Sequence, residues 1–312
     1  MYKTILVPLD DSPGRRQALP FASQIATATG ARVILMQAVY AQGEGGNALA
    51  QQQARLTDAA VAYLEPMAAT LQADGLAVQI ATLAARPEDA IPLEIELDNV
   101  DLVVMTTRPR SLFGRWVFGS VAEAVLSRTH TPVFLARMSD TKATPADPLR
   151  QTCFLVPLDG SLFAEAALPH AIALARAFDG QVRLLRVVVP PKGQGHGRLP
   201  SEKTVAEVTT RIDHAKRYLE SLAAPLREQG LAVDTDVQVG EAAATILAEG
   251  RDCSVVVMST HGRTGLARLT AGSVAMEVLK RGDHPVLVVR PTSLQTNGSH
   301  SHLDADSAII HS

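Results

Sequence analysis

The sequence predicts two tandem α/β domains, each built around a doubly wound parallel β-sheet. Short β-branched runs alternate with Ala-rich stretches of helical spacing along the whole chain. Runs such as LVVM at 102–105 and VVVM at 255–258 are apolar at every position, as in parallel strands that helices cover on both faces. The second half of the chain also repeats the first.

The repeat is detected as ordered matches with nearly constant spacing. ILVPLDDS around Pro8 returns as FLVPLDGS around Pro157, 149 residues later. The segment from Tyr63 returns from Tyr218 at an offset of 155, and GSVAEAVL from Gly119 returns as GSVAMEVL at an offset of 153. We therefore expect one domain at 1–140, a second at 150–292, a polar linker between them and a flexible tail at 293–312.

Each half contains five expected strands separated by expected helices. The strands of the first half are expected at 4–9, 33–39, 77–83, 102–106 and 133–136, with helices including 16–29, 48–73 and 121–128. Those of the second half are expected at 153–158, 182–189, 232–239, 254–259 and 286–290. The last strand of each half is an edge, and unpaired edges invite association. The two halves could pair internally about a pseudo-twofold axis, or chains could combine as a homodimer, and both remain open.

Composition excludes several classes of protein. The 312 residues carry a net charge of −3, which argues against nucleic-acid binding and against attachment to an anionic membrane. No apolar run is long enough to span a bilayer, and the N-terminal stretch carries acids where a signal peptide would be apolar. The two cysteines, Cys153 and Cys253, are expected to be small buried hydrophobes rather than reactive thiols, which fits a cytoplasmic protein. No histidine or cysteine spacing indicates a metal site made of protein side chains.

Ligands of open α/β sheets bind beyond the carboxyl ends of the strands, where the strand order reverses. In the second half, the first strand ends in Pro157-Leu158-Asp159 and the fourth ends at Met258. The fourth strand continues as STHGRTGLARLTAGSV, in which Ser273 can cap a helix whose free N–H groups attract phosphate. Neither a Walker A string nor a dinucleotide fingerprint occurs. On these residues alone, phosphate binding and a loop whose glycines only form turns remain equally open.

The same residues resemble the universal stress protein family, α/β proteins related to bacterial UspA. The resemblance covers both halves, and it implies a Rossmann-like, adenine nucleotide alpha hydrolase-like fold. ATP-binding members carry G-x-x-G, nine residues and G-[ST] after the fourth strand, and STHGRTGLARLTAGS matches this signature except for Ser259 at the first glycine. The Cβ of Ser259 should lower the affinity without abolishing binding.

The resemblance implies a site for ATP, with Mg²⁺ or Mn²⁺ held through the phosphate oxygens. Asp159 would bind adenine, Val187 would line its pocket, and Met258 and Ser259 would contact the base and ribose through their backbone. The complete expected site is Pro157, Leu158, Asp159, Val187, Met258, Ser259, His261, Gly262, Arg263, Gly272, Ser273 and Val274.

The first half departs from the signature. Thr106 and Pro109 stand at the first two glycine positions, and a proline has no N–H to donate to a phosphate. Ser120 and Glu123 have capping-box spacing, so the glutamate would compete with an anion for the helix N-terminus. We expect a weak or lost nucleotide site there.

The resulting expectation is a cytoplasmic, ATP-binding stress-response regulator or sensor. The first alternative is a slow Mg²⁺-dependent ATPase or a protein that phosphorylates itself at Ser273 or Thr264. The second is a scaffold that binds protein partners and no nucleotide.

Overall fold

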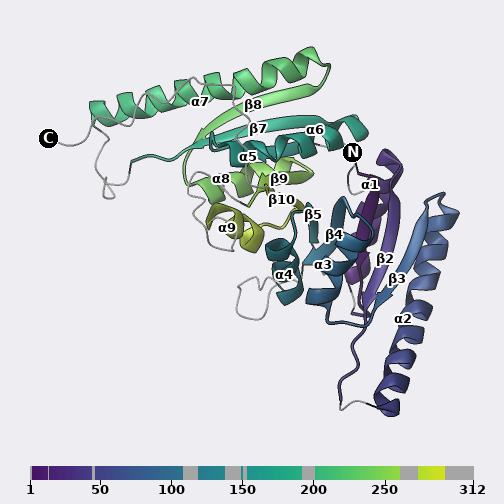
Figure 1. The fold of residues 1–312 in the computed structure, drawn as a ribbon. Coiled ribbons are helices and arrows are strands. Elements are labelled where there is room, and N and C mark those ends of the chain that lie inside the picture. Colours follow the sequence, from purple (N-terminus) through teal and green to yellow (C-terminus); the bar gives the residue numbers. More distant parts are fainter. Residues whose placement is uncertain are drawn as a thin grey trace, which may run out of the picture.

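The computed structural model describes residues 2–12, 14–43, 46–107, 119–137, 149, 153–191, 201–260 and 273–291. The described strands form one ten-stranded sheet in the order β3-β2-β1-β4-β5-β10-β9-β6-β7-β8 (Figure 1). The expected linker core at 139–148 and the tail at 293–312 lie outside the described residues.

The first half contributes five parallel strands and their covering helices. The strands are β1 (Thr4–Pro8), β2 (Arg32–Ala38), β3 (Val78–Leu83), β4 (Leu102–Thr107) and β5 (Val133–Arg137). The helices are η1 (Arg15–Ala18), α1 (Leu19–Thr29), α2 (Asn47–Ala73), α3 (Pro87–Leu97) and α4 (Ser120–Arg128).

The second half repeats this arrangement. Its strands are β6 (Cys153–Pro157), β7 (Gln181–Val188), β8 (Ala232–Val239), β9 (Val255–Ser259) and β10 (Val286–Val289), all parallel to their neighbours within the half. Its helices are α5 (Leu162–Glu165), α6 (Leu168–Ala177), α7 (Glu202–Glu228), α8 (Ala242–Glu249), η2 (Gly250–Asp252) and α9 (Ser273–Arg281). The doubly wound parallel fold is therefore confirmed, and the strands lie within a few residues of the expected ranges.

The two halves join through their last strands. β5 and β10 pair antiparallel, with Val133 opposite Val288 and Leu135 opposite Val286. The strand order is symmetric about this joint, as two halves related by a pseudo-twofold axis require. Internal pairing, one of the two arrangements that the sequence leaves open, is therefore observed.

Two hydrophobic layers cover the sheet and run through both halves. One layer packs under α1, α2, α6 and α7, and it includes Phe134 and Phe154, whose side chains are fully buried. The other packs under α3, α4, α8 and α9. Tyr2 in the first half shares a hydrogen bond with Nδ1 of His170 in the second, 2.9 Å long. The halves thus share their cores as well as their sheet.

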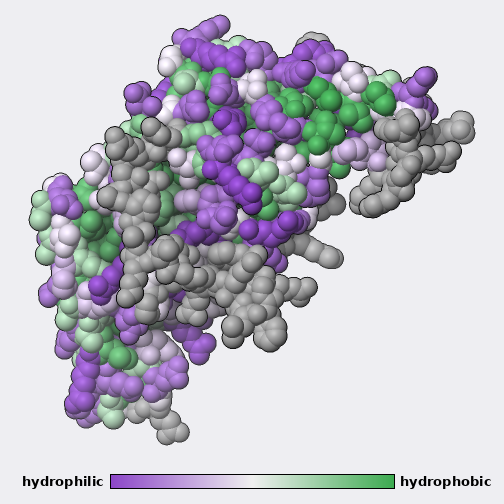
Figure 2. Space-filling view, turned by 180° about the vertical axis from the view of Figure 1, so that it is seen from behind, coloured by the Kyte–Doolittle hydropathy of each residue, from purple (hydrophilic) through white to green (hydrophobic). Residues whose placement is uncertain are grey.

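The surface is mixed in polarity. Figure 2 shows hydrophilic and hydrophobic residues interspersed on the face seen from behind, with a larger hydrophobic area on the upper part of the molecule, where Figure 1 places the second half. Within the described residues, no helix is both long and apolar enough to cross a membrane.

Two local expectations are wrong. Cys153 and Cys253 are buried as expected, but they form a disulfide with a Cα–Cα distance of 4.5 Å. The cysteine count therefore no longer supports a reducing compartment. Ser120 does not cap α4: it is the first helical residue, and Gly119, which has no side chain to accept a hydrogen bond, holds the N-cap position. The capping box with Glu123 fails because the helix starts one residue earlier than that motif needs.

Candidate functional site

The expected site lies where the strand order of the second half reverses, between β6 and β9. Pro157 ends β6, and the N–H of Leu158 continues the parallel ladder by donating to the carbonyl of Leu185 at 2.8 Å. Asp159 therefore lies just beyond the carboxyl end of the sheet. Its Oδ1 accepts hydrogen bonds from the backbone N–H of Ser161 at 2.9 Å and from the Ser161 hydroxyl at 2.5 Å. This turn fixes the carboxylate just beyond the carboxyl end of β6.

Three further expected residues gather on one face of the sheet. Met258, near the end of β9, belongs to the core under α8 and α9, and Val187 from β7 and Val274 from α9 pack against that core. Ser259 ends β9 opposite Val289 of β10 and is 8% exposed. Val187, Met258 and Val274 thus lie in the same apolar layer, on the face of the sheet that α8 and α9 cover.

The remaining expected residues have different outcomes. Ser273 is helical, as the first described residue of α9, and so does not hold the N-cap position expected for it. His261, Gly262, Arg263 and Gly272 lie outside the described residues, and their role in binding phosphate stays a prediction.

The first half contains a cavity at the corresponding place. Its volume is about 60 Å³, and it lies at the carboxyl ends of β1 and β4. The residues that line it are Pro8, Leu9, Asp10, Arg15, Met36, Ala38, Pro87, Ile91, Met105 and Val121. Six of these are repeat counterparts of expected site residues: Pro8, Leu9, Asp10 and Ala38 at an offset of 149 residues, and Met105 and Val121 at an offset of 153. These repeat positions therefore converge on one cavity, which supports their grouping in the second half.

Sequence reasoning missed several polar side chains near the two crevices. The hydroxyl of Tyr63 donates to the backbone carbonyl of Asp10 at 2.8 Å. The hydroxyl of Tyr218 donates to Oε1 of Glu165 at 2.9 Å, and burial, with that hydrogen bond, raises its pKa above the usual range. Arg186 donates from Nη1 to the carbonyl of Leu158 at 3.1 Å. The repeated YLE at Tyr63 and Tyr218 was the available signal, and both tyrosines pack against the hydrophobic layer under α2 and α7.

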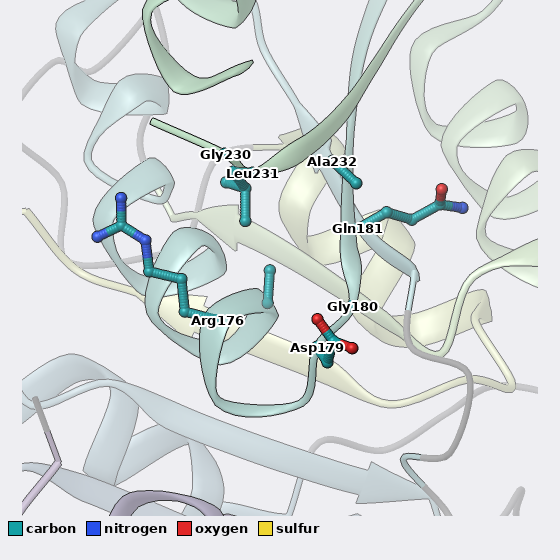
Figure 3. Close-up of a pocket in the computed structure, with 8 residues that line it drawn as sticks. Arg176, Asp179, Gly180, Gln181, Gly230, Leu231 and Ala232 are labelled. Carbon is teal, nitrogen blue, oxygen red and sulfur yellow. The ribbon is translucent and has the colours of Figure 1, made fainter. Parts of the chain in front are cut away.

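A second cavity, of about 510 Å³, lies at the opposite edge of the second half, where β7 and β8 begin. Figure 3 shows the charged groups of Arg176 and Asp179 on different sides of this hollow, directed away from each other. Arg176 donates to Oε1 of Gln229 at 2.8 Å. Because the charged groups of Arg176 and Asp179 do not point to one place, the hollow lacks the convergent polar groups that a small-molecule site needs.

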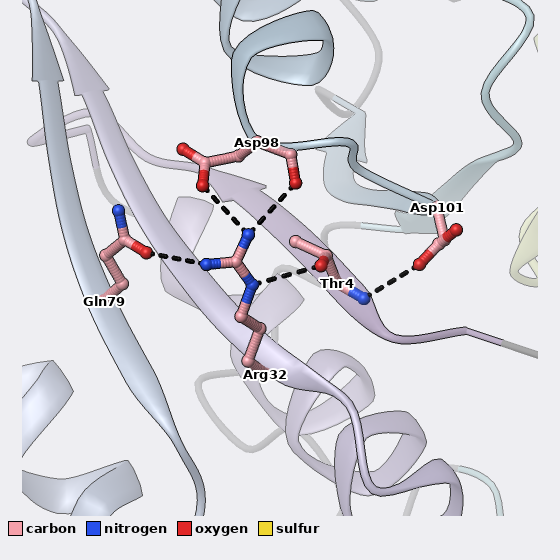
Figure 4. Close-up of polar contacts among 5 residues, drawn as sticks. All are labelled: Thr4, Arg32, Gln79, Asp98 and Asp101. Carbon is pink, nitrogen blue, oxygen red and sulfur yellow. Dashed lines mark hydrogen bonds and ion pairs between the residues drawn. The ribbon is translucent and has the colours of Figure 1, made fainter.

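Charged groups also cluster at the amino edge of the first half (Figure 4). Arg32 binds the Oδ1 of Asp98 at 2.9 Å, Oγ1 of Thr4 at 3.1 Å and Oε1 of Gln79 at 3.0 Å. Asp101 accepts the backbone N–H of Thr4 at 3.0 Å. These contacts tie β1 to the turn before β4, so the cluster serves the fold rather than the crevice at the other edge. No group of three or more metal-ligating side chains occurs within the described part of the chain.

Comparison with known proteins identifies the family. The model of the Universal stress protein family matches residues 1–137 and again 154–290. Universal stress protein MJ0531 of Methanocaldococcus jannaschii is 35% identical over 143 residues, which cover 44% of this chain and 80% of that protein. Universal stress protein Mb2028c of Mycobacterium bovis is 26% identical over 208 residues, covering 64% of this chain and 65% of that protein.

Solved structures agree on the fold. The crystal structure of a universal stress protein from Archaeoglobus fulgidus superposes with a TM-score of 0.70 at 20% identity, covering 92% of this chain and 98% of that one. A putative universal stress protein from Pseudomonas aeruginosa gives a TM-score of 0.65 at 18% identity, covering 93% and 94%. The repeated sequence, the strand order of each half and the two family matches lead to one conclusion: this chain belongs to the universal stress protein family, with two family domains in tandem.

Proposed function

We propose that this protein binds ATP at the crevice of its second half and acts as a nucleotide-dependent regulator of a stress response. Two observations support the proposal: the Asp159 carboxylate is held by Ser161 directly after β6, next to the point where the strand order reverses, and Val187, Met258 and Val274 belong to one apolar layer of the same half.

Each part of this arrangement suits one part of the nucleotide. The Asp159 carboxylate accepts a hydrogen bond from the exocyclic amino group of adenine, and the apolar wall excludes water from the face of the ring. The nine-residue helix α9 begins at the same edge, and its free N–H groups and dipole favour the negative phosphates. Mg²⁺ or Mn²⁺ would enter through the phosphate oxygens of ATP.

The test is ATP titration of the intact protein and of Asp159→Ala by calorimetry. Loss of a hydrogen bond to a charged group costs roughly 1.5–3 kcal/mol, so the dissociation constant should rise roughly 10- to 100-fold. Asp10→Ala is the matched control because Asp10 makes the same turn, with its Oδ1 accepting from Ser12, in the first half. It should leave ATP binding within about twofold of wild type.

Two results would contradict the proposal. One is wild-type protein that binds no ATP at millimolar concentration. The other is an Asp159→Ala variant that binds ATP as tightly as wild type.

Incubation with ATP and Mg²⁺ separates a regulator from an enzyme. A regulator leaves the nucleotide intact over hours, whereas a slow ATPase releases ADP. Self-phosphorylation would add a phosphate to the protein, and Ser273, exposed at the start of α9, is the described acceptor to examine by mass spectrometry.

A further inference from the structure

An arginine lies in the crevice of the first half. Arg15, from η1, places its Nε 3.3 Å from Oδ2 of Asp10, and its Nη1 donates to the backbone carbonyl of Thr106 at 3.3 Å. Its side chain is 15% exposed. Asp10 follows β1 and Thr106 belongs to β4, so the guanidinium bridges the two strands between which the strand order reverses.

The two groups that Arg15 bridges are the repeat counterparts of Asp159 and Ser259. In the second half those positions face the base and ribose in the proposed ATP site. Arg15 therefore spans, in the first half, the space that a nucleoside would need. The cavity that remains beside it is about 60 Å³, whereas small-molecule sites usually measure about 300–1,000 Å³.

The second half has no such side chain at the matching position. The counterpart of Arg15 is Ala164, a buried residue of α5. The alignment is secure there because Leu19-Pro20 and Leu168-Pro169, which follow, keep the same offset of 149 residues. The methyl group of Ala164 cannot bridge the two strand ends as Arg15 does, and the arginine beside the second-half turn, Arg186, comes from β7 and donates to the carbonyl of Leu158 at 3.1 Å.

The bridge that Arg15 forms leaves some buried hydrogen-bonding groups without partners among the described residues. Among the described residues, its Nε makes no hydrogen bond despite its proximity to Asp10, and the buried hydroxyl of Thr106 has no partner. The Asp10 side chain is 44% exposed, and a partly solvated ion pair contributes about 0–1 kcal/mol. Removing Arg15 should therefore cost little stability while it frees polar groups that a ligand can pair with.

We propose that Arg15 is an intramolecular occupant that excludes adenine nucleosides from the first-half crevice, so that only the second half takes ligand. The identity of the ligand rests on the proposed function of the second half. With Arg15 removed, Asp10, Ala38, Met105 and Val121 present the same kind of carboxylate and apolar wall as their counterparts.

Titration with adenosine tests the proposal in the full-length chain. Adenosine is the probe because it does not depend on a phosphate loop, and the first-half loop contains Pro109, which lacks an N–H. We expect wild type to bind one adenosine per chain and Arg15→Ala to bind two. Arg15→Ala combined with Asp159→Ala should return to one, because only the opened first-half crevice then keeps its carboxylate.

Arg16→Ala is the matched control. Arg16 is the neighbouring exposed arginine, and its guanidinium stacks over the ring of Tyr63 at 5.0 Å from the ring centre. This variant removes the same charge without opening the crevice, so it should still bind one adenosine. Arg15→Ser provides a second opening variant should Arg15→Ala fail to fold, and it should also bind two.

The outcomes separate this inference from the proposed function. If wild type, Arg15→Ala and Arg15→Ser all bind one adenosine, Arg15 does not exclude ligand and the inference is overturned, while the second-half site stands. If wild type binds none and the Arg15 variants bind one, the inference stands and the second-half site fails. If none of the three binds adenosine, both fail.

Discussion

At the scale of single residues, burial changes the chemistry of Glu94 in α3. Its side chain is 4% exposed, and burial, a hydrogen bond with Asp98 and the charge of Asp98 raise its pKa to about 7, against a smaller opposing effect of Arg32. The usual pKa of a glutamate in an unfolded chain is about 4.3. Between those values the folded state holds a proton that the unfolded state has lost.

This difference predicts a pH dependence of stability. The free energy of unfolding should fall as pH rises from about 4.5 to 7, because the unfolded state binds fewer protons in that range, and it should level off above. Glu94→Gln, which cannot ionise, should remove this decline and unfold with a free energy roughly 1–2 kcal/mol above wild type at pH 8, after allowance for solvent screening.

Urea unfolding at pH 5, 6, 7 and 8 measures the effect. Asp89→Asn on the same helix is the control, because Asp89 is half-exposed and pairs with Arg128 at the surface. A Glu94→Gln variant that follows the wild-type pH profile would show that Glu94 ionises normally.

At the scale of elements, the two halves use different chemistry to connect the start of their first strand to the turn before their fourth strand. In the first half, Arg32 and Asp101 bind Thr4 at the start of β1. In the second half, the counterpart of Thr4 is Cys153, which is linked to Cys253 just before β9. Each device ties the first strand of its half to the turn before the fourth strand.

The disulfide closes a loop of 100 residues, so its loss should destabilise the second half by roughly 2–4 kcal/mol. We expect a reductant to lower the thermal midpoint of the oxidised protein. The double variant Cys153→Ala, Cys253→Ala should unfold near the reduced wild type and should not respond to reductant. Equal midpoints for wild type with and without dithiothreitol would contradict this expectation, and mass spectrometry of the alkylated protein reports the thiol state directly.

Local patterns in the sequence predicted the elements, because central strands such as β9 are continuous apolar runs like VVVM, outer strands are rich in β-branched residues, and the repeat is visible in its nearly constant spacing. The group of Asp159, Val187, Met258 and Val274 followed from the rule for strand ends combined with the family resemblance. The disulfide and Arg15 could not be predicted in this way. Cys153 and Cys253 are 100 residues apart, and Arg15 meets Thr106 only after the sheet has formed, so both contacts are products of tertiary structure.

At the scale of the whole molecule, the joint between the halves is reinforced by a reciprocal pair of arginines. Arg137, at the end of β5, donates from Nη2 to the carbonyl of Leu279 in α9 at 2.6 Å. Arg290, just after β10, donates to the carbonyl of Ser127 in α4. Each arginine therefore binds the last turn of a helix of the other half, where the helix dipole favours a cation.

Removal of Arg137 should weaken this joint. Burial lowers its pKa to about 10, so it stays charged at neutral pH, and Arg137→Ala would leave the buried carbonyl of Leu279 without this donor. An unsatisfied buried acceptor costs about 1–3 kcal/mol. The free energy of unfolding, measured by urea denaturation, should therefore fall by about 1–3 kcal/mol, and the urea midpoint should fall with it. Arg128→Ala, which removes a surface ion pair to Asp89, should change the free energy of unfolding by less than about 1 kcal/mol. If both variants unfolded at the same urea concentration, Arg137 would have no special role at the joint.

Because β5 and β10 hydrogen-bond to each other, the described strands leave β3 and β8 as the outer strands of the sheet. β8 carries Asp234 and Asp236 along this rim. Another copy of the chain laid alongside would bring carboxylate against carboxylate, and such repulsion opposes edge-to-edge growth. The duplication thus turns two strand edges that would pair with other molecules into an internal seam, and the carboxylates of β8 discourage fibre formation at that border.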